Sequence, residues 1–478
     1  MARITEDGIH EECGVFAICA PGMDVAQLAY LGLFALQHRG QEGCGLAVWN
    51  DGKIRFHKRL GLVNDVFNEE ILAGLPGSLA IGHVRYATTG ETSELNTQPI
   101  VANYYQGQFA LAHNGNLTNT EKLRDSLAKT GSLFQTTTDT EVICNLLARY
   151  AENSMDVAMH KAMLDLEGSY ALVAVNDGKI FAARDPYGNR PLCIGALPNG
   201  AGYVVASESC SLDTVGADFV RDVDPGEIII IDEDGVHSVA TQKASRTAHC
   251  IFEYVYFARP DSTIDGINVN QSRRRMGAIL ARETGDLDVD IVIPVPDSGT
   301  TAAIGYAEAA GKQFTQGILK NRYTARSFIQ PTQAMRERMV NLKLSPIREE
   351  IGGKKVAVVD DSIVRGTTSK RLVALLRERG AAEVHMLITC PPVLYPCYYG
   401  IDTAERDKLI AANNSIEEIR QYIGADSLHY LSLEGLYEAV GGEDVYCAAC
   451  LNGDYICGYP DWKSEHRRNT CGKENHYL

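Results

Sequence analysis

The chain has 478 residues, and its 45 basic and 61 acidic side chains give a formal net charge of −16. This length favours two or more domains, and the acidic balance argues against a general nucleic-acid binder, which would present a basic face. No apolar run approaches the roughly 18 residues of a membrane span, and the polar, partly acidic start is unlike a secretory leader. We therefore expect a cytoplasmic protein with no nucleic-acid or membrane partner.

Cys13 stands out near the start of the chain, in Glu11-Glu12-Cys13-Gly14-Val15-Phe16. Taken alone, it fits a small core residue of a first strand. The segment resembles the start of the class II glutamine amidotransferases, in which the cysteine becomes the mature N-terminus, so residues 1–12 would be a propeptide. The chemistry supports such processing. A free α-amine, with a pKa of about 8, can act as base for its own side-chain thiol, which a peptide nitrogen cannot do.

Short β-type runs dominate the first half of the chain and are separated by Gly, Asn and Asp turns. They are Gly45–Val48, Leu79–Ile81, Phe109–Ala112, Tyr170–Val175, Ile180–Ala183, Tyr203–Ser207 and Glu227–Ile231. Helical patterns interrupt them at Val25–Gln37, Thr120–Thr130 and Asp139–Glu152. This alternation predicts antiparallel sheets with helices packed outside, an α+β arrangement.

Further segments follow in the order of the class II amidotransferases: Gln37–Gly45, Gly82–Gly90, Ala112–Leu117, Thr138–Glu141 and Arg184–Pro191, the last of which we interpret as structural. By resemblance, Arg85 binds the glutamine α-carboxylate and Asp139 binds its α-ammonium. Asn114 and the amide of Gly115 would form the oxyanion hole. Arginine offers a forked donor set for a carboxylate, and amides on a glycine turn can face a developing oxyanion. Taken singly, Arg85 also fits a surface ion pair and Asn114 a turn.

The second half changes character after the polar stretch Thr241–Ala248. Asp290–Val295, Lys354–Val359 and Glu383–Thr389 are compact apolar strands, and the first two lead into helices. Strand–helix–strand order requires right-handed crossovers and therefore a parallel sheet.

The pattern of Val356–Ser369 predicts a buried strand that ends at the two carboxylates Asp360 and Asp361. A turn of small residues and the start of a helix follow. Exposed amides at a helix start form an anion site, and carboxylates at a strand end can hold sugar hydroxyls or Mg²⁺. An ordinary strand–turn–helix is the alternative. The segment resembles the phosphoribosylpyrophosphate (PRPP) signature of the type I phosphoribosyltransferases. The residues that would hold the 5-phosphate are Arg365, Gly366, Thr367, Thr368 and Ser369.

Two more segments resemble parts of that family. Val295–Thr301 follows a strand and resembles the pyrophosphate loop, with Asp297 as a PRPP-binding residue and Ser298 as a Mg²⁺ ligand beside Asp360 and Asp361. Lys320–Phe328 resembles the loop that closes over PRPP. The positive charges of Lys320 and Arg322 suit pyrophosphate, and closure would exclude water. A solvated basic loop is the alternative for this last segment.

A glutaminase in front of a PRPP site resembles the amidophosphoribosyltransferase family across almost the whole chain. The resemblance implies that glutamine, PRPP and water give 5-phosphoribosylamine, glutamate and pyrophosphate, the first committed step of de novo purine synthesis. Cys13 would attack the glutamine amide, and ammonia would pass internally to C1 of PRPP. The resemblance also implies a homotetramer that purine nucleotides inhibit.

The chain has 13 cysteines. Because a reducing compartment disfavours disulfides, another role for these thiols has to be considered. Some members of this family carry a [4Fe–4S] cluster as well as a propeptide. By resemblance, its ligands are Cys250, Cys397, Cys447 and Cys450. Two alternatives stay open. The tail thiols could be unligated, or a local zinc site could form from Cys447, Cys450, Cys457 and Cys471.

The combined patterns and resemblances predict four segments. Residues 1–12 form the propeptide, and residues 13–245 form an N-terminal-nucleophile (αββα) glutaminase domain of the α+β class. Residues 246–440 form an α/β type I phosphoribosyltransferase domain with a parallel sheet. Residues 441–478 form a Cys-rich segment that closes the iron–sulfur site.

Two other classes of function share one half of this arrangement. A PRPP-sensing regulator would keep the phosphoribosyl fold without catalysis, and it predicts a DNA-binding segment and a damaged catalytic site. Another class II amidotransferase, making an amino sugar or asparagine, would need a sugar isomerase or an ATP-binding second half. The acidic charge argues against the first, and the Asp360–Thr368 motif argues against the second.

Overall fold

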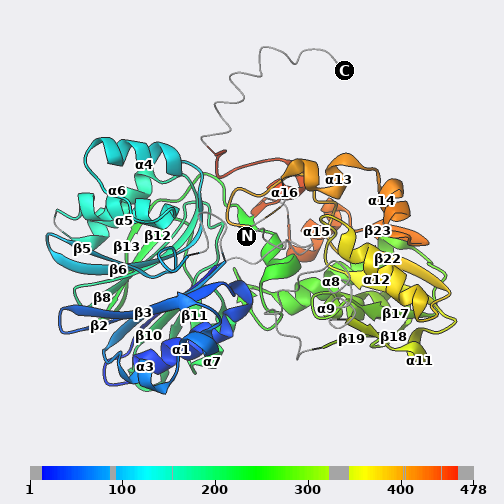
Figure 1. Ribbon diagram of the computed structural model, residues 1–478, viewed down its shortest axis with the longest axis horizontal. Coiled ribbons are helices and arrows are strands. Elements are labelled where there is room, and N and C mark those ends of the chain that lie inside the picture. The colour runs from blue at the N-terminus through cyan, green and yellow to red at the C-terminus, as the bar shows by residue number, and fades with distance from the viewer. Residues whose placement is uncertain are drawn as a thin grey trace, which may run out of the picture.

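The computed structural model describes residues 13–86, 93–152, 154–321, 344–401, 403, 405–442 and 444–460. The proposed propeptide, Arg322 and Cys471 lie outside the described residues. Figure 1 shows the first half of the chain in one body and the second half in another beside it. Within the described ranges, no helix is long and apolar enough to cross a membrane.

An antiparallel sheet of seven strands, in the order β11-β9-β10-β1-β4-β2-β3, forms one layer of the first body. Its strands are β1 (Gly14–Cys19), β2 (Gly43–Asn50), β3 (Lys53–Leu60), β4 (Leu79–Arg85), β9 (Cys193–Ala196), β10 (Tyr203–Ala206) and β11 (Asp218–Asp222). The helices on its outer face are α1 (Val25–Ala35), α2 (Val63–Val66), α3 (Glu69–Ala73) and α7 (Ser209–Thr214). A short helix, η1 (Gln37–Arg39), follows α1.

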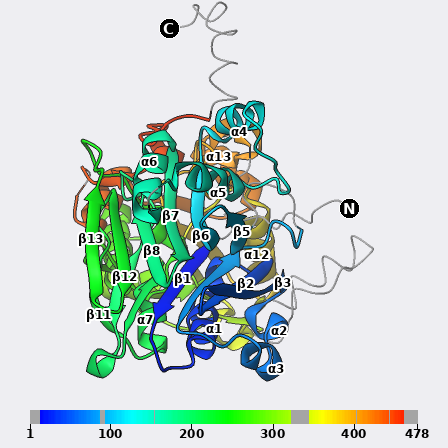
Figure 2. The same cartoon turned by 90° about the vertical axis from the view of Figure 1, so that its left-hand side faces the viewer.

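A second antiparallel sheet has six strands in the order β13-β12-β8-β7-β6-β5. Its strands are β5 (Ile100–Tyr104), β6 (Gly107–Leu117), β7 (Gly168–Asn176), β8 (Lys179–Arg184), β12 (Glu227–Asp232) and β13 (Gly235–Thr241). Its outer face carries α4 (Thr120–Lys129), α5 (Asp139–Tyr150) and α6 (Met155–Asp165). Figure 2 shows the two sheets between the two groups of helices.

Strand β1 shows why the two sheets stack. Its side chains alternate between faces. Val15 and Ala17 pack against Ala112 and other residues of the second sheet, whereas Phe16 and Ile18 pack under the helices of the outer layer. Every residue of β1 is buried, as expected for a strand covered on both faces. The αββα arrangement predicted for the first half is therefore confirmed.

The second body is built on five parallel strands in the order β18-β17-β21-β22-β23. They are β17 (Ile291–Pro294), β18 (Gln313–Phe314), β21 (Lys355–Asp360), β22 (Glu383–Ile388) and β23 (Ser427–Tyr430). One face packs against α8 (Val269–Thr284), α9 (Thr300–Ala310) and α15 (Leu433–Val440). The other packs against α12 (Thr367–Glu378) and α14 (Ile416–Ile423). The predicted parallel sheet is confirmed.

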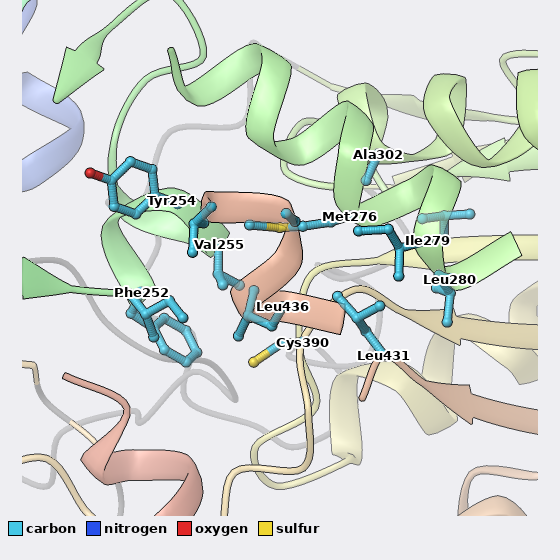
Figure 3. Close-up of a cluster of buried hydrophobic side chains, with 14 of the residues drawn as sticks. Phe252, Tyr254, Val255, Met276, Ile279, Leu280, Ala302, Cys390, Leu431 and Leu436 are labelled. Carbon is cyan, nitrogen blue, oxygen red and sulfur yellow. The ribbon is translucent and has the colours of Figure 1, made fainter. Parts of the chain in front are cut away.

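The first of these two cores is shown in Figure 3, where Met276, Ile279 and Leu280 of α8 meet Leu436 of α15. Shorter elements complete the second body. They are β14 (His249–Cys250), η3 (Glu253–Phe257), β15 (Thr263–Ile264), β16 (Ile267–Asn268), β19 (Ile318–Lys320), β20 (Leu344–Pro346), α11 (Arg348–Ile351), η4 (Arg406–Lys408), α13 (Ile410–Asn413), β24 (Tyr446–Cys447) and α16 (Ala449–Asn452). In the first body, the short helix η2 (Pro198–Gly200) lies between β9 and β10.

A buried ion network joins the two bodies. Arg39 Nη1 lies 2.5 Å from Glu208 Oε1, and Arg39 Nη2 lies 2.6 Å from Glu253 Oε1 at the start of η3. Arg190 Nη1 lies 3.7 Å from the same Glu253 oxygen. Arg39 Nε also donates to the carbonyl of Cys13 at 3.1 Å. The network therefore fixes the backbone at Cys13 to a residue of the second half.

We expect Glu253→Ala to lower the apparent free energy of unfolding by about 3–5 kcal/mol, because it removes a buried carboxylate that pairs with both Arg39 and Arg190 and leaves Arg39 with Glu208 alone. Urea unfolding followed by circular dichroism measures the change. Glu438→Ala is the matched control, since it removes a carboxylate from the exposed pair with Arg282. Equal unfolding midpoints for the two variants would contradict the role given to the network.

Candidate active sites

The predicted glutamine-site residues gather at one end of the αββα sandwich. Cys13 directly precedes β1, Arg85 ends β4, Asn114 lies in β6 and Asp139 begins α5. All of them are buried, with exposed fractions of 9%, 2%, 1% and 5% in that order. The charges of Arg85 and Asp139 both act on the Cys13 thiol. The two sheets therefore bring distant segments of the chain to one site.

The Cys13 thiol lies in a buried pocket of the backbone. Its Sγ is 3.4 Å from the carbonyl oxygen of Tyr86, to which it donates. Burial raises the pKa of the thiol to about 11, and the positive charge of Arg85 only partly opposes this effect. The peptide-linked thiol is thus protonated at neutral pH. It needs a base before it can act as a nucleophile.

Asn114 and Gly115 supply a side-chain and a main-chain amide near the end of β6. The Nδ2 of Asn114 is buried and has no hydrogen-bond partner among the residues that the structure describes. Gly115 has φ +137°, and a Cβ there would lie 2.2 Å from the carbonyl oxygen of Ser169, so only glycine fits. A buried donor without a partner is costly in a fold, and it is the group that an oxyanion site requires.

Asp139 is held as a carboxylate at the N-terminus of α5. Burial alone would raise its pKa, but nearby His113 and the hydrogen bond from the N–H of Leu117, at 3.1 Å, lower it overall. The carboxylate can therefore receive an ammonium group at neutral pH. His113, 3.6 Å from Asp139, and Glu42, 3.9 Å from Arg85, are site residues that the sequence did not predict.

The predicted PRPP residues meet at the carboxyl ends of β17 and β21, which are neighbours in the parallel sheet. The N–H of Val295 donates to the carbonyl of Val359 at 2.8 Å. A Cβ on Gly299 would lie 2.3 Å from that same carbonyl oxygen. The loop with Asp297 and Ser298 therefore packs directly on the strand that ends at Asp360. This strand edge is where α/β folds bind ligands.

Two buried carboxylates occupy this edge. Asp360 and Asp361 are 9% and 8% exposed. The N–H of Asp361 donates to Asp360 at 3.0 Å, and the hydroxyl of Ser362 donates to Asp361 at 2.6 Å. Burial and the charge of Asp361 raise the pKa of Asp360 well above its ordinary value. A divalent cation would relieve this repulsion, and oxygen ligands of this kind suit Mg²⁺ completed by substrate oxygens.

The turn after the carboxylates leaves donors for an anion. Gly366, with φ +78°, directly precedes α12, and its left-handed conformation orients the first amides of the helix. Thr367 and Thr368 are exposed, whereas Ser369 is buried. Such amides at a helix start bind phosphate.

Arg365 and Lys320 are the two predicted cationic residues of this region that the structure describes. The Nε of Arg365 is buried without a partner among the described residues, and the side chain lines a cavity of about 300 Å³ together with Lys408 and Tyr422. Lys320, at the end of β19, lies 2.9 Å from Asp297 and therefore beside the predicted pyrophosphate loop. Arg322 lies outside the described residues, so the structure does not place it.

The four predicted cluster cysteines converge from three segments of the chain. Cys250 and Cys447 are direct partners in the parallel pair β14–β24. The carbonyl of Cys450 accepts from the N–H groups of Leu394 and Tyr395, each at 3.0 Å, which brings the segment before Cys397 to α16. Cys397 packs in the same hydrophobic core as Cys250 and Cys450. It also packs against the smaller group of buried side chains that contains Cys447.

These thiols suit an iron–sulfur cluster, because four cysteines close to one another are its usual ligands. Three of them are buried and Cys397 is partly exposed. Across the described ranges, no three His, Cys, Asp or Glu side chains are grouped closely enough to hold one metal ion. A cubane cluster spreads its thiolates more widely than a single ion does.

Two family models match the chain: a glutamine amidotransferase domain over residues 83–214 and a phosphoribosyl transferase domain over residues 270–413. Fold and sites therefore define a glutamine amidotransferase joined to a phosphoribosyltransferase. The chain is 48% identical over 459 residues to the amidophosphoribosyltransferase of Archaeoglobus fulgidus, covering 95% of this chain and 100% of that one. It is 47% identical to that of Bacillus subtilis, covering 93% of each.

Solved structures agree with this result. The glutamine PRPP amidotransferase from B. subtilis, complexed with ADP and GMP, has a TM-score of 0.88 at 46% identity and covers 93% of this chain and 97% of that one. A structure described as the allosteric regulatory enzyme of purine biosynthesis has a TM-score of 0.88 at 45% identity, covering 94% and 99%. The chain belongs to the amidophosphoribosyltransferase family, which makes 5-phosphoribosylamine from glutamine and PRPP. The predicted activity is confirmed.

We expect Asp360→Asn to raise the thermal unfolding midpoint at pH 7 in metal-free buffer. The folded protein raises the pKa of this carboxyl, so ionising it there costs stability. The cost applies above the ordinary carboxyl pKa and disappears as pH falls below about 3.9, where both states are protonated. Scanning fluorimetry between pH 4 and 8 measures the difference.

Asp297→Asn is the control for this measurement, because its carboxylate lies at the neighbouring strand end but is 68% exposed. Its midpoint should follow that of the unmodified chain across the pH range. A midpoint for Asp360→Asn at or below that of the unmodified chain at pH 7 would contradict the buried repulsion.

Proposed function

We propose that the first half-reaction, hydrolysis of glutamine, takes place at Cys13. Its thiolate attacks the side-chain amide carbon, ammonia leaves, and water hydrolyses the resulting thioester. Asn114 Nδ2 and the N–H of Gly115 hold the developing oxyanion, while Arg85 and Asp139 bind the α-carboxylate and the α-ammonium. The observation that carries this assignment is the Nδ2 of Asn114, which is buried and has no partner among the described residues, in the same domain as the buried thiol.

The acidity of the thiol supports removal of residues 1–12 as a propeptide. While Cys13 is peptide-linked, burial holds its pKa at about 11, and an amide nitrogen cannot take its proton. Cleavage before Cys13 frees an α-amine with a pKa of about 8, which can serve as the base. The glutaminase domain would then comprise residues 13–245.

The second half-reaction is proposed to take place at the strand ends of the domain formed by residues 246–440. Ser298, Asp360 and Asp361 would hold Mg²⁺, which supplies positive charge to the pyrophosphate oxygens when bound. Lys320, Arg322 and Asp297 would contact the pyrophosphate. The 5-phosphate would lie on the loop Arg365-Gly366-Thr367-Thr368-Ser369. Ammonia from the first site would then attack C1 of PRPP as pyrophosphate leaves.

We further propose that residues 441–478 close a [4Fe–4S] site with Cys250, Cys397, Cys447 and Cys450 as ligands. The supporting observations are the ladder pair Cys250–Cys447 and the convergence of all four thiols from three segments. By analogy with the nucleotide-bound relative, we propose that purine nucleotides inhibit the enzyme. We also propose that it is a homotetramer in the cytoplasm.

We expect Cys13→Ala to lower glutamine-dependent formation of phosphoribosylamine by roughly 10³-fold or more, because no other group can replace the nucleophile. The rate with free ammonia should stay within about twofold, since the second site lacks this thiol. Release of glutamate with and without PRPP measures the first activity. Mass spectrometry of the active enzyme should show a chain that begins at Cys13. Retained glutamine use, or loss of both activities in a folded variant, would refute the assignment.

We expect anaerobically purified protein to be brown, with a broad visible absorption band and iron and sulfide in a 1:1 ratio, which follows from four irons and four sulfides. Cys447→Ser should lose most of both. Cys144→Ser is the matched control, because it alters a buried thiol in the core of the first domain. Colourless protein that contains zinc would instead support the local zinc site of the tail.

A further inference from the structure

The Cys397 loop, residues 397–400, lies against β6, which contains the proposed oxyanion hole, and against the neighbouring strand β7. Asn116, one residue after Gly115 on β6, donates from Nδ2 to the carbonyl of Tyr398 at 2.9 Å. Ser169, the partner of Asn116 on β7, donates from Oγ to the carbonyl of Tyr399 at 2.6 Å. Two neighbouring strands of the first domain thus bind two consecutive carbonyls of one loop in the second.

The main chain of Gly115 is in contact with the same loop. A Cβ built on Gly400 would lie 3.3 Å from both the Cα and the carbonyl carbon of Gly115. On its other side, Gly115 approaches the carbonyl of Ser169 so closely that no side chain fits. The peptide at Gly115 therefore lies between β7 and the loop, so a shift of the loop would change its surroundings.

The loop is in turn fixed by sulfur and by the C-terminal segment. The N–H of Tyr399 donates to Cys397 Sγ at 3.3 Å, and the N–H of Cys397 donates to Thr403 Oγ1 at 2.6 Å. The Tyr399 ring packs with Cys447 and Cys457, and its hydroxyl donates to the carbonyl of Gly458 at 2.9 Å. Cys397 is therefore one of the residues that hold the loop in place.

We propose that Asn116 and Ser169 are positioning residues for the glutamine reaction. They attach the oxyanion backbone to the Cys397 loop, so the orientation of the Gly115 amide depends on the state of the Cys397 sulfur. This inference rests on the proposed roles of Cys13 and Gly115. It makes the glutaminase site sensitive to the sulfur centre, whereas the strand-end site for PRPP does not use these bonds.

Ser169→Ala tests the inference with a minimal change of shape. Losing one hydrogen bond is worth up to about tenfold in rate, and we expect glutamine-dependent kcat to fall by about this factor. The KM for glutamine should change by less than about twofold, because Arg85 and Asp139 are untouched. The ammonia-dependent rate should stay the same. Ser211→Ala is the matched control, since this buried hydroxyl donates to the carbonyl of Gly32 far from the loop.

Labelling of Cys13 gives a readout that does not depend on turnover. A diazo-ketone analogue of glutamine is added to the purified enzyme, and mass spectrometry follows the rate of label transfer. We expect Ser169→Ala to slow the maximal labelling rate in proportion to kcat, with little change in the half-saturating concentration. Unchanged labelling and kcat, or an equal loss of the ammonia-dependent rate, would overturn the inference.

The dependence on sulfur is tested with Cys397→Ser. This variant should also slow the labelling of Cys13, and adding Ser169→Ala should cause little further loss, because both changes act through one loop. Losses that multiply would show independent effects and overturn the proposed connection. If Cys397→Ser does not fold, Gly400→Ala perturbs the same contact with Gly115 and should show the same lack of additivity.

The outcome also separates this inference from the function on which it rests. If the unmodified enzyme is not labelled at Cys13, both the proposed nucleophile and this inference are refuted. If it is labelled and Ser169→Ala is unaffected, only the inference is refuted.

Discussion

The guanidinium of Arg39 is the interaction on which the joining of the two domains depends. It is fully buried and contacts Glu208, Glu253 and the carbonyl of Cys13 at once. Burial alone would raise the pKa of Glu208, but His38 and Arg39 lower it overall, so this carboxylate stays charged. Buried charges are tolerated only when they are paired and hydrogen-bonded. The interface is therefore specific, because any shift between the domains would leave charges in the interior uncompensated.

The two proposed sites contain buried polar groups that lack a partner among the described residues. Within the described residues, Asn114 Nδ2 and Arg365 Nε are buried without partners, and Asp360 shares a buried edge with a second carboxylate. Most buried polar groups in a folded protein find a partner. Groups that do not are costly, and they are retained where a substrate or ion completes them. Both Asn114 and Arg365 lie at places where the sequence motifs predicted binding, whereas other buried atoms without a partner among the described residues, such as His160 Nδ1 and Gln242 Oε1, lie outside these motifs.

The sequence predicted most of the central strands of the antiparallel sheets but missed β9 and the outer strands β3, β5, β11 and β13, and it offered β1 only as the alternative for Cys13. Edge strands carry charged and exposed side chains, as in Lys53–Leu60, where only Ile54 is buried, so they lack a clear apolar signal. The candidate site residues were predictable because each motif is local, and their roles stay predictions. Glu253 and Ser169 were not, since their partners lie 214 and 230 residues away in sequence and only the fold brings them together.

Two of the connections between the domains act on the two partners of the proposed glutamine reaction. The Arg39 network fixes the backbone of Cys13, the attacking group, and the Cys397 loop fixes the backbone of Gly115, which would hold the electrophile's oxygen. Their separation must be set within a fraction of an ångström for attack to proceed. Because both anchors come from the second domain, the geometry of glutamine hydrolysis depends on that domain being seated. This arrangement suits an enzyme in which ammonia released without its acceptor is wasted.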